Sequence, residues 1–135
     1  MPRISDLVMP SRRPLVIAHR GASFYHRENT LEAFSAAMEM GADLLELDVH
    51  RTGDSALVVH HDPEIAGHLL SGLTLPEVKE VSVNVGYVVP SLAEVLELCR
   101  GKIPLDIELK EPGCEDQVLR TVLTLAVVLA LVVAG

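Results

Sequence analysis

Residues 44–62, LLELDVHRTGDSALVVHHD, decide the fold class of this chain. Two predicted strands, 44–50 and 56–61, flank the turn-like sequence RTGDS, whose Gly, Asp and Ser are residues that turns favour. In the first strand, acidic residues alternate with Leu and Val. Alternate positions of a strand point to opposite faces of a sheet, so this stretch predicts a strand with one apolar and one acidic face.

The link between the two strands determines how the histidine at the end of the second strand lies relative to the acidic residues of the first. It is too short to contain a crossover helix, so it forms either a hairpin or a stretched connection. A hairpin that turns around Gly53-Asp54 would place His61 across from Glu46. On either path we expect this histidine to lie near the acidic face.

Strand and helix patterns alternate along the rest of the chain. Most of the expected helices have an N-terminal capping residue or a terminating glycine. Two begin with a capping box, in which a hydroxyl and a carboxylate satisfy free backbone N–H groups. The expected elements are a strand at 15–18, a helix from Asn29 or Thr30 to Gly41, capping boxes at Thr74–Glu77 and Ser91–Glu94, a helix at 92–99, a strand at 103–110 and a helix from Cys114 or Glu115. This order predicts an α/β fold with mostly parallel strands.

Composition narrows the class of protein. The 135 residues are 49% apolar and 22% charged, as in a globular protein, and suggest one domain over 1–135. A net charge of −8 argues against a nucleic-acid partner, which needs clustered Lys and Arg, and is compatible with a divalent cation. Cys99 and Cys114 lack the spacing of a disulfide scaffold or a zinc site, which favours reduced thiols in a cytoplasmic protein. No apolar run follows the basic N-terminus, so we expect no secretory signal.

Residues 121–135, TVLTLAVVLALVVAG, carry no charge. As a helix they would span about 22 Å, less than the roughly 30 Å hydrocarbon core of a bilayer. A buried helix–strand pair or the stump of a longer chain is therefore expected ahead of a membrane anchor.

Carboxylates on two predicted strands form a candidate metal site. Glu46 and Asp48 share one strand face, and Asp106, Glu108 and Lys110 share a face of a later strand. Acidic side chains in an apolar setting are costly unless a cation or hydrogen bonds compensate them. Two such strands could direct three carboxylates at one cation, and oxygen-only ligands favour Mg²⁺ or Ca²⁺ over Zn²⁺.

Basic residues near the ends of the predicted strands could transfer protons and bind phosphate. His19 and His61 each end a predicted strand, and two histidines can divide proton abstraction and proton donation between them. Arg20 offers a planar fork suited to phosphate, and Lys110 a compact charge. The other histidines, at 26, 50, 60 and 68, are expected to be surface or structural residues.

Six short motifs, taken in order, resemble the glycerophosphodiester phosphodiesterase family. They are HRG (19–21), ENT followed by AF (28–34), GADLLELDVH (41–50), VVHHD (58–62), PSLAE (90–94) and DIELK (106–110). The resemblance runs from about Leu15 to Lys110. It implies a (β/α)8 TIM barrel that hydrolyses glycerophosphodiesters to glycerol 3-phosphate and an alcohol with a divalent cation, Ca²⁺ or Mg²⁺.

The resemblance also implies roles for individual residues. Glu46, Asp48 and Glu108 would bind the metal, while Arg20 and Lys110 would bind the phosphate. His19 and His61 would be the acid and base, and His61 is the match rather than His60 because the motif histidine directly precedes Asp62. Asn29 is expected to order the loop beside His19.

Length is where the chain departs from the family. A TIM barrel has eight strands and typically about 250 residues, so we expect 135 residues to supply about the first half, truncated at the C-terminus. Two copies could pair to complete a barrel, the charge-free tail could cover an open edge, or the chain could be a fragment. The alternative function is therefore an inactive fragment that acts as a binding or dimerisation module. The leaving alcohol, the native metal and the oligomeric state stay open.

Overall fold

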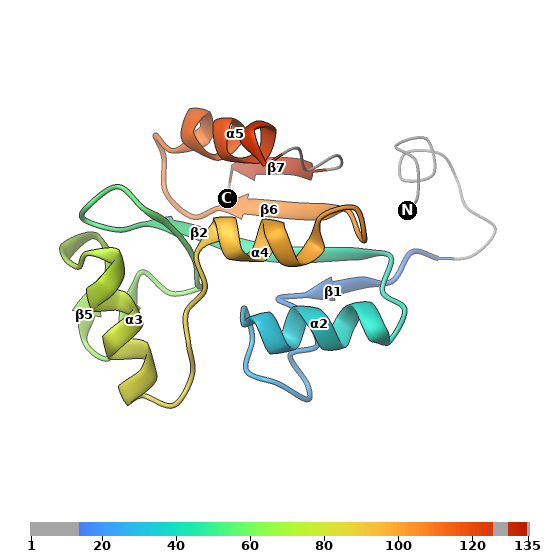
Figure 1. Ribbon diagram of the computed structural model, residues 1–135, viewed down its shortest axis with the longest axis horizontal. Helices are drawn as coiled ribbons and strands as arrows, with labels where there is room; N and C mark the ends of the chain where they lie inside the picture. The colour runs from blue at the N-terminus through green and yellow to red at the C-terminus, as the bar shows by residue number, and fades with distance from the viewer. Residues whose placement is uncertain (1–13, 126–129, 135) are drawn as a thin grey trace.

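The computed structural model describes residues 14–125 and 130–134, and centres on one mixed sheet (Figure 1). Its strands are β1 (Ile17–His19), β2 (Leu44–Arg51), β3 (Leu57–Val59), β6 (Leu105–Leu109) and β7 (Ala130–Ala134). The order is β1-β2-β6-β7 with all four strands parallel, and β3 pairs antiparallel with β2. The α/β prediction is confirmed.

Helices separate several of the strands along the chain, and capping residues explain where three of them begin. They are α2 (Leu31–Glu39), α3 (Leu75–Asn84), α4 (Leu92–Cys99) and α5 (Glu115–Thr124), with a 3₁₀ turn at Leu70–Gly72. Thr30 caps α2, and both predicted capping boxes are present, Thr74 with Glu77 and Ser91 with Glu94. A small antiparallel pair, β4 (Glu64–Ile65) and β5 (His68–Leu69), precedes α3 and was not predicted.

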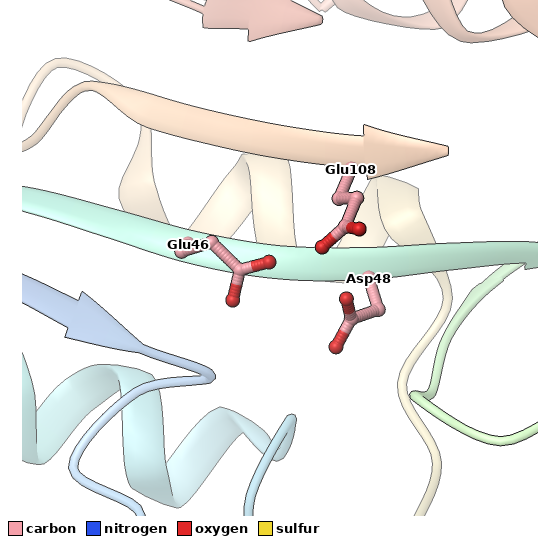
Figure 2. A group of neighbouring side chains, drawn as sticks. All are labelled: Glu46, Asp48 and Glu108. Carbon is pink, nitrogen blue, oxygen red and sulfur yellow. The ribbon is translucent and has the colours of Figure 1, made fainter. Parts of the chain in front are cut away.

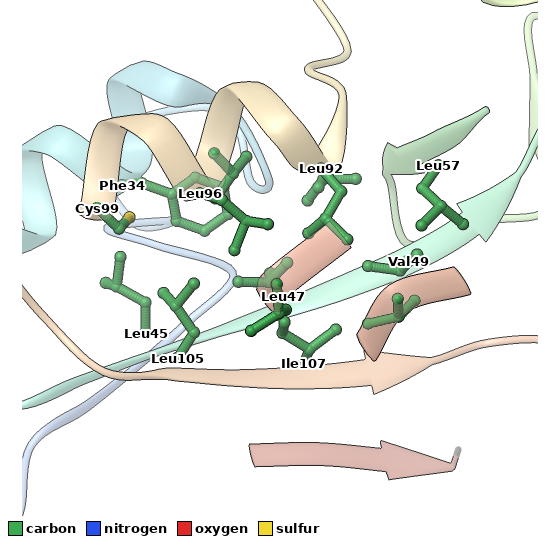
Figure 3. Packing of buried hydrophobic residues seen from close by; sticks show 14 of the residues in the cluster. Phe34, Leu45, Leu47, Val49, Leu57, Leu92, Leu96, Cys99, Leu105 and Ile107 are labelled. Atoms are coloured by element: carbon green, nitrogen blue, oxygen red, sulfur yellow. The ribbon is translucent and has the colours of Figure 1, made fainter. Parts of the chain in front are cut away.

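The apolar face of the sheet packs against α2 and α4 (Figure 3). Leu45, Leu47 and Val49 of β2 are fully buried there. Their neighbours in this core include Leu105 and Ile107 of β6, Phe34 of α2, and Leu92 and Leu96 of α4. Burying these side chains fixes which way β2 and β6 face, and the acidic residues between them therefore point to the opposite face.

The β2–β3 hairpin differs from the predicted register by one residue. Val49 pairs with Val59, and the His60 N–H donates to the Asp48 carbonyl at 3.0 Å, so His61 does not lie across from Glu46. The turn closes through the Thr52 N–H on the Ala56 carbonyl, and is therefore centred on Asp54 rather than between Gly53 and Asp54. This shift places His60 beside β2 and His61 just beyond the end of β3.

In the charge-free C-terminal stretch, the described residues form the end of α5 and the strand β7, which is the helix–strand order that one alternative predicted, but Leu123 in the helix is exposed rather than buried. β7 pairs in parallel with β6, while residues 126–129 and 135 lie outside the described part. In the described ranges no helix combines the length and the apolar character needed to cross a membrane. β1 and β7 are the outer strands of the described sheet.

Candidate active site

Three carboxylates from two neighbouring strands meet on the acidic face of the sheet (Figure 2). The parallel register pairs Asp48 of β2 with Glu108 of β6. Glu46 lies two positions before Asp48 on the same face, and one oxygen from each of the three residues lies within 4.8 Å of the others. The structure thus brings together the three side chains that the sequence nominated, while Asp106 pairs with Glu46 and stays outside the trio.

The trio brings three carboxyl groups close together, and two of them are buried. Asp48 is fully buried and Glu46 is 7% exposed. Both carboxylate oxygens of Glu46, and Oδ1 of Asp48, have no hydrogen-bond partner among the described residues. Burial, reinforced by the charge of Asp48, raises the pKa of Glu46 to about 8. Burial also raises the pKa of Asp106.

Two cationic side chains border the trio without neutralising it. Nε of Arg20 lies 3.2 Å from Oδ2 of Asp48, and its Nη1 contacts Glu28 at 3.3 Å. Nζ of Lys110 donates to Glu108 Oε1 at 3.1 Å and lies 3.7 Å from Asp48 Oδ1. The bond from Lys110 lowers the pKa of Glu108. No Lys or Arg of the described residues makes such a contact with Glu46, which has the exposed ring of His19 as a basic neighbour instead.

The His-Arg-Gly segment places two of these groups at the end of β1. His19 pairs in register with Glu46, and its Nε2 lies 3.4 Å from Glu46 Oε2 while 63% of its side chain is exposed. The Arg20 N–H donates to the Glu46 carbonyl at 2.8 Å, which carries the ladder one residue further. Gly21 then turns with φ +83°, where a Cβ would lie 2.7 Å from the backbone of Ala33. Glycine is required there because α2 packs directly on the turn.

His61 follows β3, and its Nδ1 contacts Asp62 Oδ1 at 2.8 Å. The hydrogen bond with His61 lowers the pKa of Asp62. About a third of the His61 side chain is exposed, so the ring remains accessible. The antiparallel hairpin directs this end of β3 toward the end of β1, since the preceding residue is bonded to Asp48 and His19 pairs with Glu46.

His50 and His60 are buried and have structural partners, consistent with the prediction for them. Nε2 of His50 contacts the His61 carbonyl at 3.0 Å. His60 contacts the Asp62 carbonyl and the Tyr87 hydroxyl, and burial lowers its pKa. Both rings therefore hold the loop that carries His61.

Asn29 contributes more than the sequence indicated. Its N–H donates to the Arg20 carbonyl at 2.9 Å, which agrees with the expected ordering of the loop. Its side-chain Nδ2 also donates to Asp48 Oδ2 at 2.9 Å, a contact that was not predicted. Nineteen positions separate the two residues, and no local pattern reports such a bond.

Comparison with protein families matches residues 19–131 to the glycerophosphoryl diester phosphodiesterase family. The chain is 38% identical to a glycerophosphodiester phosphodiesterase of Caldanaerobacter subterraneus subsp. tengcongensis, an alignment that covers 82% of this chain and 53% of the relative. A Bacillus subtilis enzyme of the same name is 32% identical, with 84% and 47% covered. The chain spans about half the length of these curated relatives.

Solved structures give the same result. The glycerophosphodiester phosphodiesterase of Thermotoga maritima aligns with a TM-score of 0.82 at 30% identity, covering 92% of this chain and 55% of that one. An Oleispira antarctica phosphodiesterase in complex with the product sn-glycerol-3-phosphate aligns with a TM-score of 0.73 at 27% identity, covering 90% and 57%. The expected fold is confirmed: an α/β fold of the (β/α)8-barrel type, of which the chain forms about the first half.

Proposed function

The chain belongs to the glycerophosphoryl diester phosphodiesterase family, and from this premise we propose that the protein hydrolyses glycerophosphodiesters to glycerol 3-phosphate and an alcohol. The observation that carries the proposal is the carboxylate trio, in which Glu46 and Asp48 are buried, with three basic residues at its border: His19, Arg20 and Lys110. The glycerol 3-phosphate held by the Oleispira relative supports a substrate of this class. The inactive-fragment alternative has no comparable support.

The residues present fit a divalent cation. Glu46 has two buried oxygens and Asp48 one without a hydrogen-bond partner among the described residues, a costly arrangement unless a cation compensates it. Glu46, Asp48 and Glu108 would hold the ion, and an all-oxygen donor set favours Ca²⁺ or Mg²⁺. When bound, such an ion supplies positive charge that polarises the diester and offsets the charge developing on it.

Arg20 and Lys110 bind and orient the phosphate in this proposal. Both lie against Asp48, from opposite oxygens of its carboxylate. A diester placed over the trio would meet the Arg20 fork on one side and the Lys110 ammonium on the other. Their charges weaken the repulsion that a phosphodiester exerts on an incoming nucleophile.

His19 and His61 transfer the protons. One removes the proton from the attacking hydroxyl. That hydroxyl belongs either to water, which gives glycerol 3-phosphate directly, or to the 2-position of the substrate glycerol, which expels the alcohol and forms a cyclic phosphate that water then opens to glycerol 3-phosphate. The other protonates the departing alkoxide, whose release near neutral pH would otherwise be very slow. The contact of His19 with Glu46 and that of His61 with Asp62 orient the two rings.

The open edges of the sheet and the free thiols support two further parts of the proposal. β1 and β7 are outer strands of the described sheet, and unpaired edges favour association. We propose that two copies of the 135-residue chain pair through these edges. Light scattering of the purified chain would show a dimer, and a monomer would refute the pairing.

Cys99 and Cys114 are buried free thiols, which supports a cytoplasmic location.

Release of glycerol 3-phosphate from glycerophosphocholine tests the reaction. The assay uses Mg²⁺ or Ca²⁺ against EDTA, with His19→Ala and His61→Ala beside the control His68→Ala, an exposed histidine on β5. We expect cation-dependent turnover, lost about 10²- to 10⁴-fold in the first two variants and kept in the control. Turnover that survives EDTA, or that is unchanged in His19→Ala, would refute the mechanism. Absence of turnover from the folded wild-type chain would refute activity of this chain.

A further inference from the structure

The two oxygens of the Asp48 carboxylate have different surroundings. Oδ2 accepts a hydrogen bond from Nδ2 of Asn29 at 2.9 Å and lies 3.2 Å from Nε of Arg20. Oδ1 is buried without a hydrogen-bond partner among the described residues, and Nζ of Lys110 lies 3.7 Å away. Oδ2 is thus held by close contacts with Asn29 and Arg20, while Oδ1 has only the longer ion-pair contact with Lys110.

Asn29 is well placed to maintain this division. It is 3% exposed, and its backbone φ of +56° lies in the left-handed region that Asn tolerates better than most residues. Its N–H bonds to the Arg20 carbonyl, and the next residue, Thr30, caps α2. The backbone of Asn29 is therefore anchored at both sides, and its side chain has little freedom to leave Asp48.

The amide oxygen of Asn29 is a second unsatisfied group. Oδ1 is buried and has no hydrogen-bond partner among the described residues, although it shares a carbon with the Nδ2 that binds Asp48. A buried acceptor without a donor costs free energy unless a ligand or water completes it. Mg²⁺ in particular keeps several waters when it binds to proteins, and these waters donate hydrogen bonds.

We propose that Asn29 is the positioning residue of the cation site: its Nδ2 binds Asp48 Oδ2 so that Oδ1 of Asp48 faces Glu46 and Glu108, and its own Oδ1 accepts a hydrogen bond from a water of the bound cation. The assignment rests on the proposed cation-dependent function. Partners that hold a metal-binding carboxylate from behind commonly change metal affinity 10- to 100-fold when they are removed.

Asn29→Gly separates the side chain from the backbone. Glycine adopts the left-handed conformation freely, so the N–H bond to Arg20 is kept and only the amide is removed. Ser55→Gly is the matched control, because Ser55 also has a positive φ, +64°, but is exposed in the β2–β3 turn. Titration calorimetry with Mg²⁺ and with Ca²⁺ measures the Kd directly and needs no turnover.

We expect the Kd of Asn29→Gly to rise about 10- to 100-fold and that of Ser55→Gly to stay at the wild-type value. An unchanged Kd in a folded Asn29→Gly would overturn the role of Asn29 and leave the cation site intact. A wild-type chain that binds neither cation would overturn the cation site itself, and this assignment with it.

A measurement on the wild-type chain keeps the test independent of the variant's folding. In a ¹⁵N-labelled sample, the side-chain amide protons of Asn29 should exchange slowly with water before and after Mg²⁺ is added. Those of Asn84, exposed at the end of α3, should exchange rapidly. Rapid exchange of the Asn29 amide in the Mg²⁺-loaded protein would contradict the bond to Asp48.

Discussion

Replacing Glu46 by Gln should stabilise the cation-free protein at alkaline pH. Glu46 is buried, no Lys or Arg contacts it in the described chain, and its pKa is raised from 4.5 to about 8. Between these values the folded protein keeps a proton that the unfolded chain releases, so the free energy of unfolding falls as the pH rises from about 4.5 to about 8. Glutamine has a similar shape and no proton to lose.

The size of the stabilisation follows from the shift of the Glu46 pKa from 4.5 to about 8. Each pKa unit corresponds to about 1.4 kcal/mol, so the stabilisation by Glu46→Gln is at most about 5 kcal/mol. Water at the partly exposed Glu108 and Lys110 side of the trio screens part of this, and we expect about 2 kcal/mol at pH 8. In a chain of this size that corresponds to a rise in Tm of about 8 °C.

Thermal unfolding followed by circular dichroism in EDTA, at pH 5 and pH 8, tests the prediction. The Tm values of Glu46→Gln and wild type should agree within about 2 °C at pH 5 and separate at pH 8. Glu80→Gln, at an exposed position on α3, should show no such separation. Saturating Mg²⁺ should reverse the order, because a cation at a hundred times its Kd adds about 2.7 kcal/mol to the wild type alone. A Glu46→Gln variant with wild-type stability at pH 8 in EDTA would show that ionisation of the buried Glu46 carboxyl does not destabilise the folded protein.

Three further predictions concern the local structure. Gly21→Ala should lower the free energy of unfolding, measured in urea, by about 2–4 kcal/mol, because the new Cβ would clash with the Ala33 backbone. Gly86→Ala should lower it by only about 1 kcal/mol, because Gly86 also has a positive φ but no atom lies near its Cβ position. Equal losses of stability in the two variants would exclude the clash. Thr74→Ala should lower the free energy of unfolding by about 1 kcal/mol, because it removes the capping box of α3. An unchanged free energy of unfolding would show that the capping box does not stabilise the protein. Burial raises the pKa of Cys99 to about 12, so its thiol should react with a disulfide reagent only after unfolding, and rapid reaction in the native protein would disprove its burial.

Local sequence was sufficient for features that depend on neighbours along the chain. The capping boxes at Thr74 and Ser91 were predictable because a cap bonds groups three residues apart. The shared face of Glu46 and Asp48 was predictable because side chains alternate along any strand. The motif order also identified the family, since each motif is short and contiguous.

Tertiary structure decided everything that depends on pairing between distant segments. Alternation along β6 could not choose between Asp106 and Glu108. The motif resemblance named Glu108, and the register of β2 with β6 sets it opposite Asp48. The turn centred on Asp54 moved His61 one position from its expected place. The bond from Asn29 to Asp48 crosses nineteen positions. Contacts of this kind form only when the apolar faces of β2 and β6 are buried against α2 and α4, because that burial sets the register on which they depend.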